Sequence, residues 1–229
     1  MARAEKVIVL GLSGALLLLS VFSAYVEARP FLLRGHQEQE LVNAFLTLSK
    51  ERLSGSLFDS GRARSARLNS CLRSLTLAVG QRGPARASAF KIAEACLTIA
   101  EANVAHSPLS SNDWLLAAVL AQRLGQIERA KRYLDASFRT GPNEQWIAER
   151  RALFAHQIRD RLDSELLKDL DRDYLLLLRT RRGACALATR YLRDESIREH
   201  LVSLAETTEF DVQDRFLRLV RARLDGFTC

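Results

Sequence analysis

The sequence predicts an all-α protein in which an N-terminal transmembrane helix precedes a series of antiparallel helix hairpins. Three observations lead to this fold class. Residues 7–26 carry no charged side chain. Leu, Ala and Arg dominate the 229 residues and aromatic residues make up only 7%, a mixture that favours helices over strands. After Pro30, apolar residues recur at helical spacing between short segments with Gly or Pro, and the 48% hydrophobic content excludes a disordered chain.

The first expected element is the uncharged segment, residues 7–26. At about 1.5 Å per residue, a helix of this length spans about 30 Å, the thickness of the hydrocarbon core of a bilayer. We interpret residues 1–28 as a membrane anchor, and a cleavable signal peptide with Val26 and Ala28 before the cut is the alternative. The N-terminal tail is short and should stay inside, so we expect a single-pass protein of the bacterial inner membrane with its bulk in the periplasm. If the segment is cleaved, the protein is instead secreted to the periplasm.

The helices that follow are predicted from apolar periodicity and from the Gly, Pro and Ser residues between them. Residues 29–229 are expected to form one helical domain with short loops, and no alternating strand pattern appears in the sequence. Ser107–Pro108 ends one helix, and Ser111 or Asn112 is expected to cap the next. The expected helices cover residues 37–53, 63–79, 85–106, 112–124, 128–138, 144–158, 164–181, 184–192, 196–206 and 211–224.

The cysteines indicate an oxidising compartment. Their even number, 4, suits disulfide formation, and none belongs to a Cys-x-x-Cys motif. Cys71 and Cys96 are almost equally far from the turn expected at residues 80–84, so an antiparallel hairpin brings them to the same height and predicts a disulfide. By elimination Cys185 pairs with Cys229. The alternative is four small, buried apolar residues.

Residues 112–142 carry a regular pattern of large and small side chains. The bulky ring of Trp114 is expected in the groove between hairpins, while small residues let two antiparallel helices approach closely. Gly125 suits a tight turn and Pro142 ends the second helix. The residues of this pattern are Trp114, Ala118, Gly125, Ala130, Ser137 and Pro142.

This order of residues resembles the tetratricopeptide repeat. The resemblance implies an α-solenoid-like array of antiparallel hairpins, with the best repeat at residues 112–142. A degenerate repeat is placed at residues 63–108, because Pro108 lies 34 residues before Pro142, although Gly80 stands in the place of Trp114. An ordinary helical bundle that meets the pattern by chance is the alternative.

A second resemblance covers residues 107–155, where SPLSSN, WLLAAVLAQRLG and SFRTGPNEQWIAERRALFA follow one another. This stretch is similar to membrane-associated accessory proteins of bacterial exopolysaccharide and O-antigen assembly. The resemblance implies an accessory role in the production or export of polysaccharide.

The sequence predicts no catalytic residue, no metal site and no cofactor. The four histidines are scattered, and phosphate-binding and nucleophile-elbow motifs are absent from the sequence. Asp169, Asp171 and Asp173 imitate the start of a calcium loop, but Tyr174 and Thr180 stand where Gly and Glu are required. A solvated helix face is therefore expected there.

A basic stretch lies in residues 60–93, which contain no acidic residue. Such a surface could attract anionic lipid head groups, an acidic glycan or nucleic acid, and a plain solvated face is the alternative. No aromatic residue stands between the arginines, which argues against stacking on bases. The arginines of this predicted surface are Arg62, Arg64, Arg67, Arg73, Arg82 and Arg86.

Together these features favour a membrane-anchored, periplasmic scaffold that binds a protein partner, such as a polysaccharide assembly complex. Asn112, Gln122 and Trp146 are the candidate contacts on the inner helices. Two alternatives stay open: a cytoplasm-facing regulator that binds nucleic acid or anionic lipid, and an enzyme with an unrecognised site.

Overall fold

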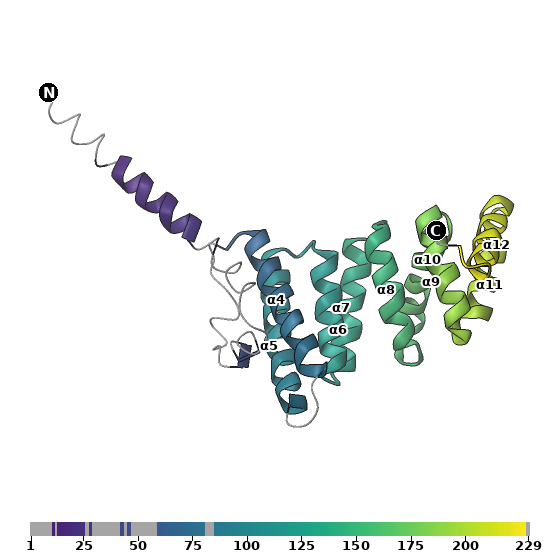
Figure 1. Cartoon of the computed structure of the whole chain (residues 1–229), viewed down its shortest axis with the longest axis horizontal. Helices are drawn as coiled ribbons and strands as arrows, with labels where there is room; N and C mark the ends of the chain where they lie inside the picture. Colours follow the sequence, from purple (N-terminus) through teal and green to yellow (C-terminus); the bar gives the residue numbers. More distant parts are fainter. Residues whose placement is uncertain are drawn as a thin grey trace. The chain divides into compact units, whose positions relative to one another are not determined.

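The computed structural model describes residues 11, 13–25, 28, 42–43, 45–46, 59–80 and 85–227. All regular structure in these residues is helical, which confirms the all-α class (Figure 1). The chain divides into two compact units, Met1–Ser107 and Pro108–Cys229. This boundary lies within the single domain predicted for residues 29–229, at the Ser107–Pro108 helix stop.

The N-terminal unit is built around a helix pair, α4 (Gly61–Gly80) and α5 (Ala85–His106), which pack against each other (Figure 1). Cys71 and Cys96 form a disulfide with their Cα atoms 5.6 Å apart, as predicted. Val42 and Phe45, in the helix expected at residues 37–53, are also buried. Asn43 and Leu46 of that expected helix are also described as helical, and its remaining residues lie outside the described part.

The apolar N-terminal segment is helical over residues 13–25. Its large apolar side chains, including Leu18 and Tyr25, are 57–73% exposed. Among the described residues, no helix has both the length and the hydropathy needed to cross a membrane. The predicted membrane span covers residues 7–26, and residues 7–10, 12 and 26 of it are not among the residues that the structure describes.

The C-terminal unit is a succession of short helices in which α6 packs on α7, α8 on α9, and α10 on α9 and α12 (Figure 1). Its core is formed by apolar side chains such as Leu134, Leu170 and Leu201. The helices are α6 (Ser111–Arg123), α7 (Ile127–Thr140), α8 (Gln145–Gln157), α9 (Ser164–Leu178), α10 (Arg181–Arg193), α11 (Arg198–Glu206) and α12 (Phe210–Leu224). Single 3₁₀ turns at Arg159–Arg161 and Glu195–Ile197 precede α9 and α11.

Two helix boundaries differ from the sequence prediction for reasons that the contacts explain. Ser110, and not Ser111 or Asn112, caps α6, because the Ser110 hydroxyl accepts a hydrogen bond from the backbone N–H of Asp113. The helix expected at residues 164–181 is interrupted at Thr180. The Thr180 hydroxyl accepts a hydrogen bond from Gly183 N–H at 3.1 Å and so begins α10.

Candidate functional site

The α6–α7 hairpin carries the residues of the repeat pattern. Ala118, Ala130 and Ser137 are fully buried, which gives the close helix contact that their small size predicts. Gly125 follows α6 with a positive φ of 75°, a conformation that glycine adopts without strain. Pro142 follows directly after the α7 cap residue Gly141.

Trp114 makes its contacts inside this hairpin. Its ring lies 5.7 Å from the ring of Tyr133 on α7, and its indole N–H donates to the Pro108 carbonyl at 2.8 Å. The Tyr133 contact joins the two helices of one hairpin, and the Pro108 contact joins α6 to the segment before it. A place for this ring between hairpins stays a prediction.

The two ends of the hairpin are joined by a pair of serines. The Ser111 hydroxyl donates to the Ser137 carbonyl at 2.9 Å, and the Ser137 hydroxyl donates to the Ser111 carbonyl at 2.8 Å. Gly141 packs so closely here that an added Cβ would lie 2.7 Å from Ser111 Cβ. α6 therefore begins directly against the end of α7.

Arg151 of α8 projects into this junction and is fully buried. Its Nη1 donates to the carbonyl oxygens of Ser137 at 2.8 Å and Gly141 at 2.9 Å. Its guanidinium also lies over the Phe138 ring, 4.9 Å from the centroid. Arg151 thus attaches α8 to the last turn of α7 and supplies further donors to the carbonyl groups there.

Asp173 of α9 completes the charge pair. Its two carboxylate oxygens each accept one hydrogen bond from Arg151, from Nε and Nη2, both at 2.8 Å. Burial raises the pKa of Asp173, and the Arg151 guanidinium opposes that shift by stabilising the carboxylate. The pair links the α6–α7 hairpin to α8 and α9.

This arrangement corrects the expectation of a solvated face for the three aspartates of α9. Asp173 is 2% exposed and paired with Arg151, Asp171 accepts from His200 at 2.7 Å, and Asp169 pairs with Arg172. The three side chains therefore have three different cationic or imidazole partners. In the described part of the chain, no group of three His, Cys, Asp or Glu side chains could hold a metal ion.

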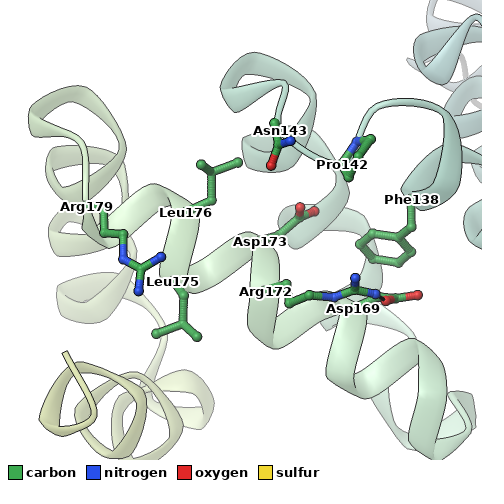
Figure 2. Close-up of a pocket in the computed structure, with 9 residues that line it drawn as sticks. All are labelled: Phe138, Pro142, Asn143, Asp169, Arg172, Asp173, Leu175, Leu176 and Arg179. Carbon is green, nitrogen blue, oxygen red and sulfur yellow. Dashed lines mark ion pairs between the residues drawn. The ribbon is translucent and has the colours of Figure 1, made fainter.

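A cavity of about 240 Å³ lies beside the charge pair, lined by residues of α7, α9 and the Pro142–Asn143 segment (Figure 2). Figure 2 shows Asp169 and Arg172 paired on α9, with Arg179 further along the same helix. Both carboxylates that line the cavity are already paired with arginines. The charge pair is therefore a structural connection between α8 and α9.

A larger hollow of about 340 Å³ lies between α8 and α10, and we call it the α8–α10 groove. Leu153 of α8 and Leu187 of α10 line its walls, and Tyr174 and Leu177 of α9 also line it. Leu153 is 49% exposed. Trp146, one of the residues singled out from the sequence, is 54% exposed and precedes Leu153 by two helical turns on the same face of α8.

The polar lining of the α8–α10 groove is supplied mainly by α10. Arg190, Arg193 and Asp194 lie at the end of this helix, and Arg190 approaches Asp194 to 3.6 Å. Burial raises the pKa of Tyr174 to about 12, so its hydroxyl stays protonated at neutral pH. A mostly apolar hollow with a few charged groups at one end suits a peptide segment better than a small polar substrate.

The other two predicted inner-face residues lie on α6. Asn112 accepts a hydrogen bond from Arg150 of α8, so these two helices present polar groups to the same surface. Gln122 is partly exposed near the other end of α6.

A cluster of Ser, His and Asp near the end of α10 was not foreseen. The Nε2 of His156 lies 3.0 Å from Ser196 Oγ and 3.4 Å from Asp194 Oδ2. A nucleophile-activating triad needs the serine and the carboxylate on opposite ring nitrogens, and here both face the same nitrogen. Burial, followed by the charge of Arg190, lowers the pKa of His156.

The basic stretch is divided by contacts within the chain. Arg67 pairs with Asp59, and Arg64 donates to the Asp59 carbonyl oxygen. Asp59 directly precedes residues 60–93, so this acidic partner was not part of the basic stretch defined from the sequence. Arg62 and Arg73 are exposed on α4. Arg82 and the side chain of Arg86 lie outside the described residues, and anion binding by this surface stays a prediction.

The second predicted disulfide is not decided by the structure. Cys185 is buried in α10 and is not a free thiol. Cys229 lies outside the described residues. The Cys185–Cys229 bridge therefore stays a prediction.

Comparison with protein-family models, with curated proteins and with solved structures found no match to the chain.

Proposed function

We propose that the chain is a membrane-anchored scaffold that faces the periplasm and binds a segment of a partner protein in the α8–α10 groove. The observation that carries the proposal is the exposed apolar face of α8. Leu153, 49% exposed, lines a hollow of about 340 Å³, and Trp146, 54% exposed, lies two helical turns before it on the same face. Exposed aromatic and aliphatic residues beside a hollow are typical of binding surfaces.

The rigidity of the surrounding helices supports this binding role. The groove is formed by α8 and α10, and Arg151 fixes α8 to the preceding hairpin through buried hydrogen bonds. A partner segment would meet a surface that is already ordered, so binding loses less conformational entropy.

The proposed location is supported by two features of the N-terminal unit. Residues 13–25 form a helix whose apolar side chains have no cover within the described chain, and lipid would provide one. The Cys71–Cys96 disulfide is of the kind that persists in oxidising compartments. The anchor and the periplasmic location are proposed together, because the anchor would carry the domain across the membrane.

A narrower proposal concerns the partner. We propose a component of a polysaccharide assembly complex, on the basis of the resemblance in residues 107–155, a stretch that includes Leu153 of the groove and the nearby Trp146. Replacing Leu153 with Asp in the producing cell should lower polysaccharide output, measured per cell, while the amount of the protein stays constant.

The location is tested with two C-terminal reporter fusions, one active only in the periplasm and one active only in the cytoplasm. We expect activity from the periplasmic reporter, with the protein in the membrane fraction. Activity from the cytoplasmic reporter alone would replace this proposal with the cytoplasm-facing regulator.

Binding in the groove is tested by placing a photo-crosslinking amino acid at Trp146 or Leu153 in living cells. We expect one discrete crosslinked product at both positions. Val202, which is 40% exposed and lies on α11, a helix that contributes no residue to the groove, is the matched control and should give no such product. Equal crosslinking at all three positions would contradict a groove-specific partner.

A further inference from the structure

The last helix, α12, carries an apolar stripe that the described chain does not cover. Phe210, Leu217 and Leu224 are 82%, 53% and 69% exposed. They are spaced by seven residues, which places them on one face of the helix. An adjacent face of the helix, with Phe216 and Val220, is buried in the core of the C-terminal unit.

Charges along this outer face change sign at Leu217. Asp211 and Asp214 precede it, and Arg218 and Arg221 follow it. Asp214 and Arg218 already form an exposed ion pair at 3.0 Å within the helix. Arg215 departs from this order in the sequence, but its guanidinium turns toward α9, where it donates to the Leu178 and Arg179 carbonyls.

We propose that α12 pairs with α12 of a second copy of this chain, antiparallel, about a two-fold axis at Leu217. In this arrangement Leu217 meets its own counterpart, and Phe210 lies opposite Leu224 of the second copy. The acidic half of each helix faces the basic half of the other, so Asp214 meets Arg218 and Arg221 of the second copy.

Charge complementarity selects a second copy as the occupant and fixes the orientation. In a parallel pair with its two-fold axis along the helices, Asp214 of one copy and Arg218 and Arg221 of the other would lie on opposite edges of the interface, so these attractive contacts would not form. In a two-fold symmetric interface the same patch of both copies must match itself. The stripe meets this requirement, because Phe210 and Leu224 are equally far from Leu217 along the helix.

The size of the stripe sets the expected strength of the association. One pair of helices of this length buries less than the ~1,600 Å² of a standard interface, so we expect a dissociation constant on the order of micromolar. The apolar residues supply most of the binding free energy, since exposed ion pairs contribute little. This dimer does not depend on the proposed function of the α8–α10 groove.

The geometry is tested by cysteine crosslinking of the full chain in membranes of the cells that express it. Leu217→Cys should form a disulfide-linked dimer under mild oxidation. Phe210→Cys and Leu224→Cys should each crosslink poorly to themselves, because antiparallel copies of one position lie about 21 Å apart. The same two variants should crosslink to each other when co-expressed. The wild-type chain measures any background from its own cysteines.

The energetics are tested by sedimentation of the purified full chain. Leu217→Glu should weaken the dimer at least tenfold, whereas Leu109→Glu, at an 80% exposed position outside α12, should leave it unchanged. Asp214→Arg should weaken the dimer, and adding Arg221→Asp should restore most of the loss. Circular dichroism should show equal helix content in all variants, because each changed side chain points outward.

Several results would overturn the proposal. One is a monomer at every concentration together with no crosslink at Leu217. Another is a dimer that Leu217→Glu leaves intact, which would place the interface elsewhere. Self-crosslinking of Phe210→Cys as efficient as that of Leu217→Cys would show a parallel pair, and a monomer whose α12 variants change only vesicle binding would assign the stripe to lipid.

Discussion

Arg151 connects three helices of the C-terminal unit, α7, α8 and α9. One guanidinium satisfies carbonyl groups at the end of α7 and the carboxylate of Asp173 on α9. A buried charge pair stabilises a fold only when its remaining hydrogen bonds are also made, as they are here. In the sequence, Arg151 lies between Ala148 and Ala152 on the apolar face of its helix. A charged residue at such a position indicates a buried partner of opposite charge, here Asp173 on the buried face of α9.

Arg151→Met should lower the free energy of unfolding by about 3–5 kcal/mol, because it leaves the Asp173 carboxylate buried without a partner. The double variant Arg151→Met/Asp173→Leu should lose less than the single one. Urea denaturation followed by circular dichroism measures both. Arg150→Met removes an exposed neighbour on the same helix and should change stability by less than about 0.5 kcal/mol; an equal loss in both single variants would contradict the assigned role.

His156 should make the stability of this unit depend on pH. Burial and the charge of Arg190 lower its pKa in the folded state below the 6.5 of the unfolded chain. As pH falls through 6.5, the unfolded chain takes up a proton that the folded one does not, so stability is lost on acidification. Thermal unfolding from pH 7.5 to 5.5 should show this fall in Tm, reduced in His156→Gln.

The matched control for this pH effect is His106→Gln, at the exposed end of α5. It should leave the fall in Tm unchanged. The Ser196 hydrogen bond keeps the pKa of Asp194 below its usual value, so that carboxylate titrates outside this pH range. A His156→Gln protein with the same pH profile as the wild type would show that other groups cause the effect.

At the scale of elements, two glycines shape the turns between helices, Gly183 at the start of α10 and Gly125 after the end of α6. Gly183 lets α10 begin directly against the end of α9, because an added Cβ would lie 2.5 Å from the Leu177 carbonyl oxygen. Gly125 instead has open space around it and a positive φ of 75°. The two positions therefore resist substitution for different reasons, one steric and one conformational.

These reasons predict different outcomes for substitution. Gly183→Ala should cost about 1–3 kcal/mol, because backbone atoms must move to admit the methyl group. Gly125→Ala should cost about 1 kcal/mol from backbone strain, and Gly125→Asn should cost less, since Asn tolerates the left-handed region. Urea denaturation of the three variants checks this order, and a Gly125→Asn protein less stable than Gly125→Ala would contradict it.

The periodicity of the sequence located most helices to within a few residues. Turn residues such as Gly125 and Pro142 lie between the helices where they were expected. The break between α9 and α10 was predicted at residues 182–183, whereas α9 ends at Leu178 and α10 begins at Arg181, because the side chain of Thr180 caps the new helix.

At the scale of the whole molecule, the two units should respond separately to mutation. The Cys71–Cys96 disulfide closes a loop with a sequence separation of 25 within the N-terminal unit. Replacing both cysteines with Ser should cost about 3.5 kcal/mol through the entropy of the unfolded chain. Hydrogen exchange should become faster in α4 and α5 and stay unchanged in α8 and α9.

Arg151→Met provides the reciprocal measurement, with faster exchange in α8 and α9 and unchanged exchange in α4 and α5. Faster exchange throughout the chain in either variant would show that the units unfold together. Because each variant acts in a different unit, the pair of experiments measures how strongly the two units are coupled.

The sequence by itself determined the helical class, the helix order and the Cys71–Cys96 bridge, because periodicity along the chain and equal distance from a turn are local properties. Only the tertiary structure revealed the Arg151–Asp173 pair, the α8–α10 groove and the uncovered stripe on α12. An apolar or charged helix face looks the same in sequence whether or not another helix covers it. Whether such a face is buried or exposed depends on which elements, distant in the sequence, pack beside it. The local sequence does not contain that information.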